Sequence, residues 1–201
     1  MSRRLSRYLR TILRPRTKIA AGLLLAGLGV TTWILRVSTV VPPRSVRDPV
    51  TVRLLSAGRH SGLLLPCDDG RVVEYDYGDW NWYALGKDDW WRAPATVLWP
   101  NQGTLGRRYV RAEDEGSVHT SSLSVERRDA QRLLARLDAA FAAGGDSLHS
   151  DLYDMDFVRS PERFWFAHDC QDATAEWLRE LGCSVRPTPI RTGLSLNDAA
   201  D

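Results

Sequence analysis

The residues best suited to covalent chemistry are a cysteine and a histidine that stand far apart in the chain. Cys170 follows His168 and Asp169 at the expected start of a helix. A thiol in the first turn of a helix is close to the positive end of the helix dipole and to unpaired backbone N–H groups. Both favour the nucleophilic thiolate, and the same N–H groups could hold an oxyanion during acyl transfer. A buried structural cysteine is the alternative role for Cys170.

A thiol nucleophile needs a base, usually histidine, and a third group that orients the base. His149 and His119 lie in polar segments and are interpreted as surface residues. His168 is two residues from Cys170, a spacing that rarely lets the side chains meet, so it is interpreted as a hydrogen-bond donor flanking the helix. His60 stands between glycines before the apolar strand 63–65, where the backbone can approach a partner closely. His60 is therefore the candidate base, with a pocket-lining or structural role as the alternative.

Three segments resemble the bacterial DUF2459 family of uncharacterised proteins. Residues 58–66 are similar to the family's Gly-Trp-His-Thr-Gly-hydrophobic-Pro signature, 74–79 to its Glu-Phe-Gly-Trp-Gly-Asp, and 170–185 to its Cys-Asn-Thr-Trp helix and the short strand that follows. The resemblance covers roughly residues 50–190. The order histidine, acidic strand, cysteine on a helix also resembles circularly permuted papain-like (NlpC/P60-type) thiol enzymes. That group includes the exported lipoprotein N-acyltransferase domain of the Lnb type.

The resemblance implies a nucleophile at Cys170 and a base at His60, with the third group on the strand after His60. Glu74 is the first choice because it matches an acid of the family. Asp76 competes, because alternation along a strand puts it on the same face as Glu74. Asp79 also matches, but it lies in a glycine-containing bend where it could cap a turn. A solvated strand edge is the alternative for all three acids.

This chain departs from the family beside the candidate site. Arg59 stands where the family has tryptophan, and Asp76 replaces a glycine. After Cys170, residues 171–173 are Gln, Asp and Ala, where the family has Asn, Thr and Trp. The nucleophile and the base are kept while their neighbours change, so an altered substrate or a loss of activity is an open alternative.

An aromatic-rich segment over residues 78–91 is predicted to be a loop. Mixed Trp, Tyr and charged residues suit a sugar platform, an acyl-chain groove or a bilayer interface. They also suit a lid that packs over a small core. The residues predicted to contact substrate are Trp80, Trp82, Tyr83 and Arg59.

The N-terminal region predicts a membrane anchor. Residues 1–18 carry seven basic side chains and no acid, and residues 19–35 carry no charge. A helix over 19–35 would span only about 26 Å, so we expect Arg36 to snorkel and residues 37–41 to complete an anchor over 19–41 in the lipid bilayer. The basic tail predicts a cytoplasmic N-terminus at the inner or plasma membrane and a periplasmic or extracellular domain. A cleaved signal peptide is the alternative.

The remaining pattern predicts an α+β fold: a small, mainly antiparallel sheet with two packed helices, preceded by one transmembrane helix. A Pro-rich linker is expected over 42–49 and an exported domain over 50–201. Strands are expected at 50–55, 63–65 and 71–77, with weaker candidates at 95–99, 109–112 and 183–186. The first helix is expected to begin after an N-cap at Ser124 and to end at Gly144-Gly145. The second is expected to run from Cys170 to Gly182.

These features predict a membrane-anchored cysteine hydrolase or acyltransferase. It would act on an amide or ester of the cell envelope, either a peptidoglycan peptide or a lipid or lipoprotein acyl group. The alternative is an inactive binding or scaffold module on the same fold. No cofactor and no metal site is expected, since His168 and Cys170 form only a two-ligand fragment. Residues 19–201 carry a net charge of −5, which gives no reason to expect nucleic-acid binding.

Three cysteines leave at least one thiol unpaired within the chain. A Cys67–Cys183 disulfide that leaves Cys170 free is one arrangement, and a disulfide containing Cys170 is another.

Overall fold

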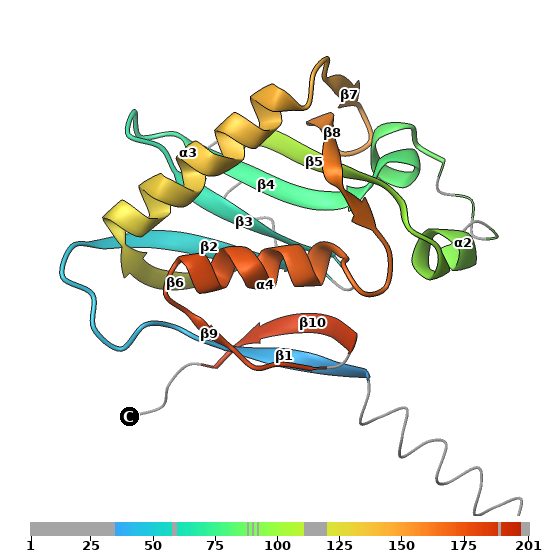
Figure 1. Ribbon diagram of the computed structural model, residues 1–201. Coiled ribbons are helices and arrows are strands. Elements are labelled where there is room, and N and C mark those ends of the chain that lie inside the picture. The colour runs from blue at the N-terminus through green and yellow to red at the C-terminus, as the bar shows by residue number, and fades with distance from the viewer. Residues whose placement is uncertain are drawn as a thin grey trace, which may run out of the picture.

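The computed structural model describes residues 35–57, 60–87, 89, 91, 93–110, 120–188 and 190–197. Helix α3 (Arg127–Ala143) crosses one face of a seven-stranded sheet. Helix α4 (Cys170–Glu180) lies between this sheet and a three-stranded one (Figure 1). The predicted α+β class, with a mainly antiparallel sheet and few helices, is confirmed.

The large sheet has the order β6-β2-β3-β4-β5-β8-β7, and the pairs within it are antiparallel. The two strands on either side of the Asp68-Asp69-Gly70 turn pair antiparallel. The strand expected at 109–112 corresponds to the end of β5, which is longer and begins at Asn101. The seven strands are β2 (Pro49–Ala57), β3 (His60–Pro66), β4 (Val72–Asp79), β5 (Asn101–Val110), β6 (Thr120–Glu126), β7 (Leu148–Ser150) and β8 (Met155–Phe164).

The small sheet changes the expected domain boundary. Strand β1 (Leu35–Val41) pairs parallel with β10 (Ile190–Leu196) and antiparallel with β9 (Ser184–Val185). The expectation that 37–41 complete a membrane helix is therefore wrong, because this β-branched run forms a strand. Residues 42–48 connect β1 to β2 inside the domain instead of tethering it. The first part of the predicted anchor, residues 19–34, and the basic tail lie outside the described residues.

Within the described part of the chain, no helix has both the length and the apolar character needed to cross a membrane.

The two long helices pack their apolar faces into one core. Leu133, Leu137 and Phe141 of α3 and Trp177 and Leu178 of α4 are buried there. Alternate residues of β4, including Val73 and Tyr75, complete this core from the sheet. The remaining residues of β4 thus point to the opposite face, where the candidate site lies.

Two sequence predictions about helix ends have different outcomes. Helix α4 ends at Glu180, two residues before the predicted Gly182, and Gly182 has the φ of +81° that is typical of a glycine that terminates a helix. The predicted N-cap at Ser124 is wrong, because Ser124 pairs with Thr51 inside the sheet. Helix α3 begins after Glu126 instead, and the Glu126 carboxylate accepts hydrogen bonds from two backbone N–H groups of the β1–β2 connection.

The aromatic segment contains more structure than predicted. Residues Trp80–Ala84 form a π-helical turn, η1, and Asp79 accepts a hydrogen bond from the Trp82 N–H at 2.8 Å. The strand expected at 95–99 is wrong, because helix α2 (Ala93–Leu98) occupies that position. Proline is well tolerated in the first turn of a helix, and Pro94 is the second residue of α2.

Candidate functional site

His60 and Asp76 form a close pair on neighbouring strands. The β3–β4 register places Gly62 opposite Asp76, and alternation puts His60 on the same face as Gly62. His60 Nε2 lies 2.9 Å from Asp76 Oδ2, and the Asp76 side chain is only 10% exposed. Asp76, the competing choice from the sequence, therefore orients His60.

Gly62 makes room for this pair. A Cβ atom at Gly62 would overlap Asp76 Oδ1 and lie 2.8 Å from the Tyr75 carbonyl oxygen. Only glycine leaves space for the Asp76 carboxylate to lie across β3 and reach His60. The glycine two residues after the histidine is thus part of the site.

Buried hydrogen bonds fix the start of α4 beside the start of β3. Ser61 Oγ lies 3.1 Å from both the Cys170 carbonyl oxygen and Thr174 Oγ1, and Thr174 Oγ1 donates to the Ser61 carbonyl at 3.2 Å. Both hydroxyl side chains are fully buried. Because Ser61 directly follows His60, these bonds bring the first turn of the Cys170 helix to the histidine.

His60 also contacts Cys170. Burial opposes protonation of His60, but four interactions outweigh it: the charge of Asp76, the hydrogen bond to Asp76, and a hydrogen bond and a charge interaction with Cys170. Together they raise the pKa of His60 to about 11. The imidazole is thus protonated at neutral pH and stands between a carboxylate and a thiol.

Tyr83 of η1 completes the surroundings of the imidazole. Its hydroxyl lies 3.2 Å from His60 Nδ1, and the two ring centroids are 5.3 Å apart. Burial, followed by the charges of Cys170 and Asp76, raises the pKa of the Tyr83 phenol. Tyr83 therefore stays protonated and can donate a hydrogen bond at the site.

Glu74, the first choice from the sequence, has a different partner. Its Oε2 lies 2.7 Å from Arg108 Nε of the neighbouring strand β5, and Glu74 is 2% exposed. Burial and the charge of Asp76 raise the pKa of Glu74 to about 7, although Arg108 opposes this. The assignment of Glu74 as the orienting acid is thus wrong, since the register pairs it with Arg108 and leaves Asp76 for His60.

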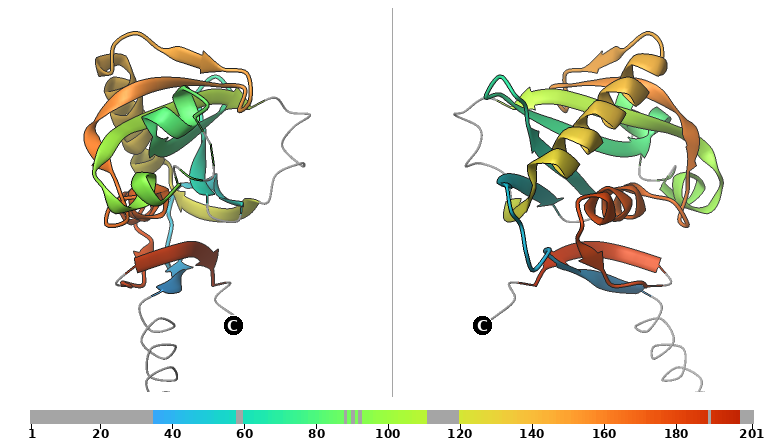
Figure 2. Two further views of the ribbon diagram at one scale, coloured as in Figure 1. Left: turned by 90° about the vertical axis from the view of Figure 1, so that its right-hand side faces the viewer. Right: turned by 60° about the vertical axis from the view of Figure 1, so that its left-hand side comes forward.

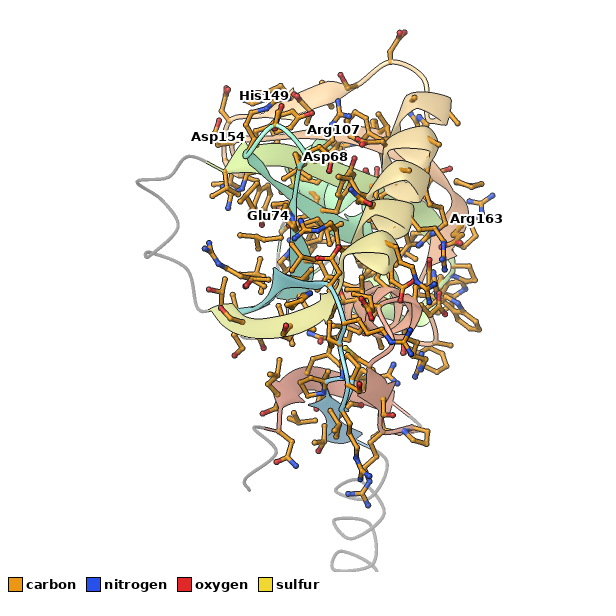
Figure 3. All side chains as sticks on the ribbon, turned by 90° about the vertical axis from the view of Figure 1, so that its left-hand side faces the viewer. Asp68, Glu74, Arg107, His149, Asp154 and Arg163 are labelled. Atoms are coloured by element: carbon orange, nitrogen blue, oxygen red, sulfur yellow. The ribbon has the colours of Figure 1, made fainter. Side chains whose placement is uncertain are left out.

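A pocket of about 260 Å³ opens beside the pair. Its polar lining consists of His60, Asp76, Tyr83 and the Glu74–Arg108 pair. Figure 3 shows Glu74 and Asp154 on the same side of the molecule, and Asp154 adds a favourable charge interaction with Arg108. Cys170 is 5% exposed and does not line this pocket. The apolar walls come from Leu55, Ala57, Leu152, Tyr153, Met155 and Phe157.

Two of the free backbone N–H groups at the N-terminus of α4 donate hydrogen bonds to the capping residue of the helix. The Asp169 carboxylate accepts hydrogen bonds from the N–H groups of Gln171 and Asp172. Burial and the charge of Asp172 raise the pKa of Asp169 to about 6. Asp172 in turn pairs with Arg191 of β10, which ties the helix start to the small sheet. The N–H groups of residues 171 and 172 are therefore committed to the cap rather than to an oxyanion.

The other residues predicted from sequence lie in different surroundings. Trp80 is buried, with the Arg159 guanidinium 4.4 Å above its ring. Trp82 is half-buried on η1, and Arg59 lies outside the described residues. His168 pairs with Glu162 at 2.9 Å, which agrees with a flanking hydrogen-bond role, and His149 is exposed as expected.

All three cysteines are thiols, so neither of the disulfide arrangements expected from the sequence is formed. Burial raises the pKa of Cys183 to about 11, and burial followed by the charge of Asp69 raises the pKa of Cys67. Among the described residues, no group of three or more His, Cys, Asp or Glu side chains could hold a metal ion.

Sequence reasoning missed the residues that come from long-range pairing. Arg108 and the walls from β8 reach the site only because β5 lies between β4 and β8. The Ser61–Thr174 contact was also missed. A local signal existed only for Ser61, which lies inside the histidine motif.

Comparison of the chain with protein-family models, with curated proteins and with solved structures finds no match.

Proposed function

We propose that this protein is a thiol-dependent acyl-transfer enzyme, a cysteine hydrolase or acyltransferase. The observation that carries the proposal is the set of contacts around His60. One imidazole pairs with buried Asp76 and also hydrogen-bonds Cys170 at the first residue of a helix. A nucleophile, a base and an orienting carboxylate in this relation are what nucleophilic acyl transfer requires.

In the proposed reaction, Cys170 reacts as the thiolate of an imidazolium–thiolate pair with His60, and its sulfur attacks the carbonyl carbon of an amide or ester. The His60 imidazolium gives its proton to the departing amine or alcohol as the carbon–heteroatom bond breaks. Water or an acceptor nucleophile then attacks the thioester and gives a proton to His60, and the carbon–sulfur bond breaks to release the Cys170 thiolate and restore the imidazolium–thiolate pair. Asp76 holds the ring so that one nitrogen faces the reacting atoms throughout.

Tyr83 is proposed to donate a hydrogen bond to the carbonyl oxygen in this reaction. Its hydroxyl lies beside His60, and its raised pKa keeps it protonated. Because Asp169 already accepts from two N–H groups of the helix start, a side-chain donor takes on more of the oxyanion stabilisation.

The resemblance and the N-terminal pattern extend the proposal. The order of His60, Asp76 and Cys170 supports a circularly permuted papain-like arrangement. The apolar run at 19–34 behind a basic tail supports a membrane anchor with the site on the exported side. The substrate class proposed is an envelope amide or ester, in a peptide or a lipid-linked acyl group.

An activated ester tests the chemistry without knowledge of the substrate. We expect a p-nitrophenyl ester to acylate the full-length protein, with a burst of p-nitrophenolate and an acyl adduct on Cys170 by peptide mass spectrometry. Cys170→Ala and His60→Ala should abolish the burst. Cys67→Ala, which removes a half-buried thiol remote from His60, is the matched control and should keep it. Acylation of Cys67 alone, or an unchanged burst in Cys170→Ala, would contradict the proposal.

Two observations favour the second candidate function, an inactive binding module. The Tyr83 hydroxyl lies at the His60 nitrogen Nδ1, and Cys170 does not line the pocket. If the Tyr83 hydroxyl blocks His60 Nδ1, Tyr83→Phe should increase the rate at which Cys170 is acylated, because this nitrogen is then accessible. A donor role predicts slower acylation in the same variant.

A further inference from the structure

Exposed tryptophan and phenylalanine side chains of the described residues occur in two segments, while other exposed apolar side chains, such as Leu152 and Tyr109, lie elsewhere. Among the described residues, those tryptophans and phenylalanines that are prominently exposed lie in or beside α2 and in the segment that follows β8. Trp91 and Trp99 are 58% and 65% exposed. We call these side chains, together with the exposed Leu85 and Leu98 and the half-buried Trp165, the aromatic end, and it consists of Leu85, Trp91, Leu98, Trp99, Trp165 and Phe166.

Strand pairing brings the two parts of the aromatic end together. Asn101 of β5 pairs with Phe164 of β8, so Trp99 and Phe166, which continue these antiparallel strands, lie at the same edge. The rings of Trp165 and Phe166 contact edge to face, with centroids 4.9 Å apart. Trp165 and His168 exchange two backbone hydrogen bonds, which fixes this segment directly before Asp169 and Cys170.

Backbone carbonyl groups in and just after α2 have a hydrogen-bond partner within the protein, so they do not depend on water. The side-chain amide of Asn101 donates to the carbonyl oxygens of Ala95, Thr96 and Trp99. Carbonyl groups at the end of a helix otherwise depend on water, and unsatisfied ones are costly in an apolar environment. The aromatic end can therefore leave bulk water without stranding these polar groups.

The chain enters the domain on the same side. Figure 1 shows α2 and the Leu35 end of β1 on the right of the molecule, and the left view of Figure 2 shows both facing the viewer. The apolar run predicted to anchor the chain directly precedes Leu35. A bilayer that holds this run is therefore close to the aromatic end.

We infer that the aromatic end lies against the lipid bilayer and holds the Cys170 helix close to the membrane surface. Tryptophan and neighbouring leucine or phenylalanine side chains favour the interface between headgroups and acyl chains. Exposed Arg163, paired with Gln102 in the same sheet edge, suits an anionic headgroup. Figure 3 shows Arg163 at the opposite edge of the molecule from Glu74.

Quenching by brominated lipids tests this contact independently of any catalytic activity. Full-length Trp33→Phe protein, which lacks the tryptophan of the predicted anchor, is reconstituted in phosphatidylcholine–phosphatidylglycerol vesicles with or without bromine on the acyl chains. We expect brominated lipid to quench part of the tryptophan emission. Leu98→Glu in this background should lower the quenched fraction by at least ~2-fold, because a carboxylate opposes entry into the interface. Leu148→Glu, on exposed β7, is the control and should leave it unchanged.

Trp99→Phe provides a second variant that adds no charge and removes one reporter. It should also lower the quenched fraction. Absence of quenching in protein that floats with the vesicles, or equal quenching in Leu98→Glu and its parent, overturns the inference while leaving the Cys170 chemistry untouched. Cross-linking of the unquenched aromatic end to another protein overturns it in favour of a protein partner. Failure to float contradicts both the inference and the predicted anchor.

Discussion

Two histidine–carboxylate pairs can be compared around Cys170. The pair of His60 with Asp76 is near Cys170 in space, and His168 of the second pair is near it in sequence. His60 Nε2 is 2.9 Å from Asp76 Oδ2, and His168 Nε2 is 2.9 Å from Glu162 Oε2. The Asp76 side chain is 10% exposed, whereas that of Glu162 is 60% exposed. Equal distances thus conceal different strengths, because solvent screens an exposed pair and a buried pair interacts in a lower dielectric.

The difference shows that nearness to the cysteine in sequence is a poor guide to function. His168 is two residues from Cys170 but belongs to a surface pair at the edge of the aromatic end. His60 is more than a hundred residues away, yet strand register and the Ser61–Thr174 contact bring it to the thiol. Substitutions in the two pairs should therefore have different effects.

The largest effect is expected from Gly62→Ala. The added methyl group overlaps the Asp76 carboxylate and meets the Tyr75 carbonyl, so β3 and β4 must move apart. We expect the free energy of unfolding, measured by urea denaturation, to fall by about 3 kcal/mol. Gly193→Ala is the matched control, because its methyl group would meet Val37 at an ordinary distance of 3.5 Å. Equal stability losses in the two variants would argue against close packing at the pair.

Neutralising the two carboxylates should have unequal effects. Asp76→Asn removes the charge that holds a largely buried imidazolium, so we expect a loss of about 2 kcal/mol in unfolding free energy. Glu162→Gln should cost about 0.5 kcal/mol or less, because that pair is solvated. Urea denaturation of both variants at neutral pH measures the contrast. Similar values would remove the distinction between the pairs.

The stability contributed by His60 should depend on pH. Its folded pKa of about 11 lies above the unfolded value of about 6.5, so the folded state binds the proton more tightly. The contribution is fully present below about 6.5 and is lost as the pH rises toward about 11, by on the order of 1 kcal/mol per pH unit. Denaturation at several pH values, in wild type and His60→Gln, measures this slope. A slope that is identical in the two proteins would contradict the imidazolium assignment.

Ser61→Ala should destabilise the protein less than Gly62→Ala or Asp76→Asn does. It removes the buried hydroxyl that bonds the Cys170 carbonyl and Thr174, at a cost of about 1 kcal/mol. Because Ser61 positions the thiol, acylation of Cys170 by the activated ester should slow by more than the stability loss explains. Ser160→Ala, which removes a half-buried hydroxyl of β8 that accepts from the Glu162 N–H, is the control. An acylation rate like that of wild type in both variants would show that Ser61 has no positioning role.

Parts of the site could be predicted from the sequence because they are local. The glycine-flanked histidine, the alternation that places Glu74 and Asp76 on one face, and the helix that starts at Cys170 each depend on short-range patterns. The choice between Glu74 and Asp76 depended on register, since Gly62 is opposite Asp76 and Arg108 is opposite Glu74. Arg108 lies on a strand whose placement beside β4 is a long-range pairing that no local pattern encodes.

The predicted boundary between the membrane anchor and the domain, placed after residue 41, was wrong for a related reason. Residues 35–41 continue an apolar run, and strand and membrane-helix patterns overlap in such a stretch. Their parallel pairing with β10 joins the two ends of the described chain, and a single sequence contains no local signal for it. The fold class was predictable because the α4 pattern and the β3–β4 hairpin are both local.

Alkylation of the three thiols by iodoacetamide shows whether His60 activates Cys170. At mildly acidic pH we predict that Cys170 reacts before Cys67 and Cys183, whose pKa values are raised by burial. His60→Ala and Asp76→Asn should slow the Cys170 reaction at least ~10-fold, because the imidazolium that stabilises the thiolate is lost or weakened. His168→Gln and Glu162→Gln should leave it unchanged. A Cys170 rate that is the same in His60→Ala and His168→Gln would contradict the account.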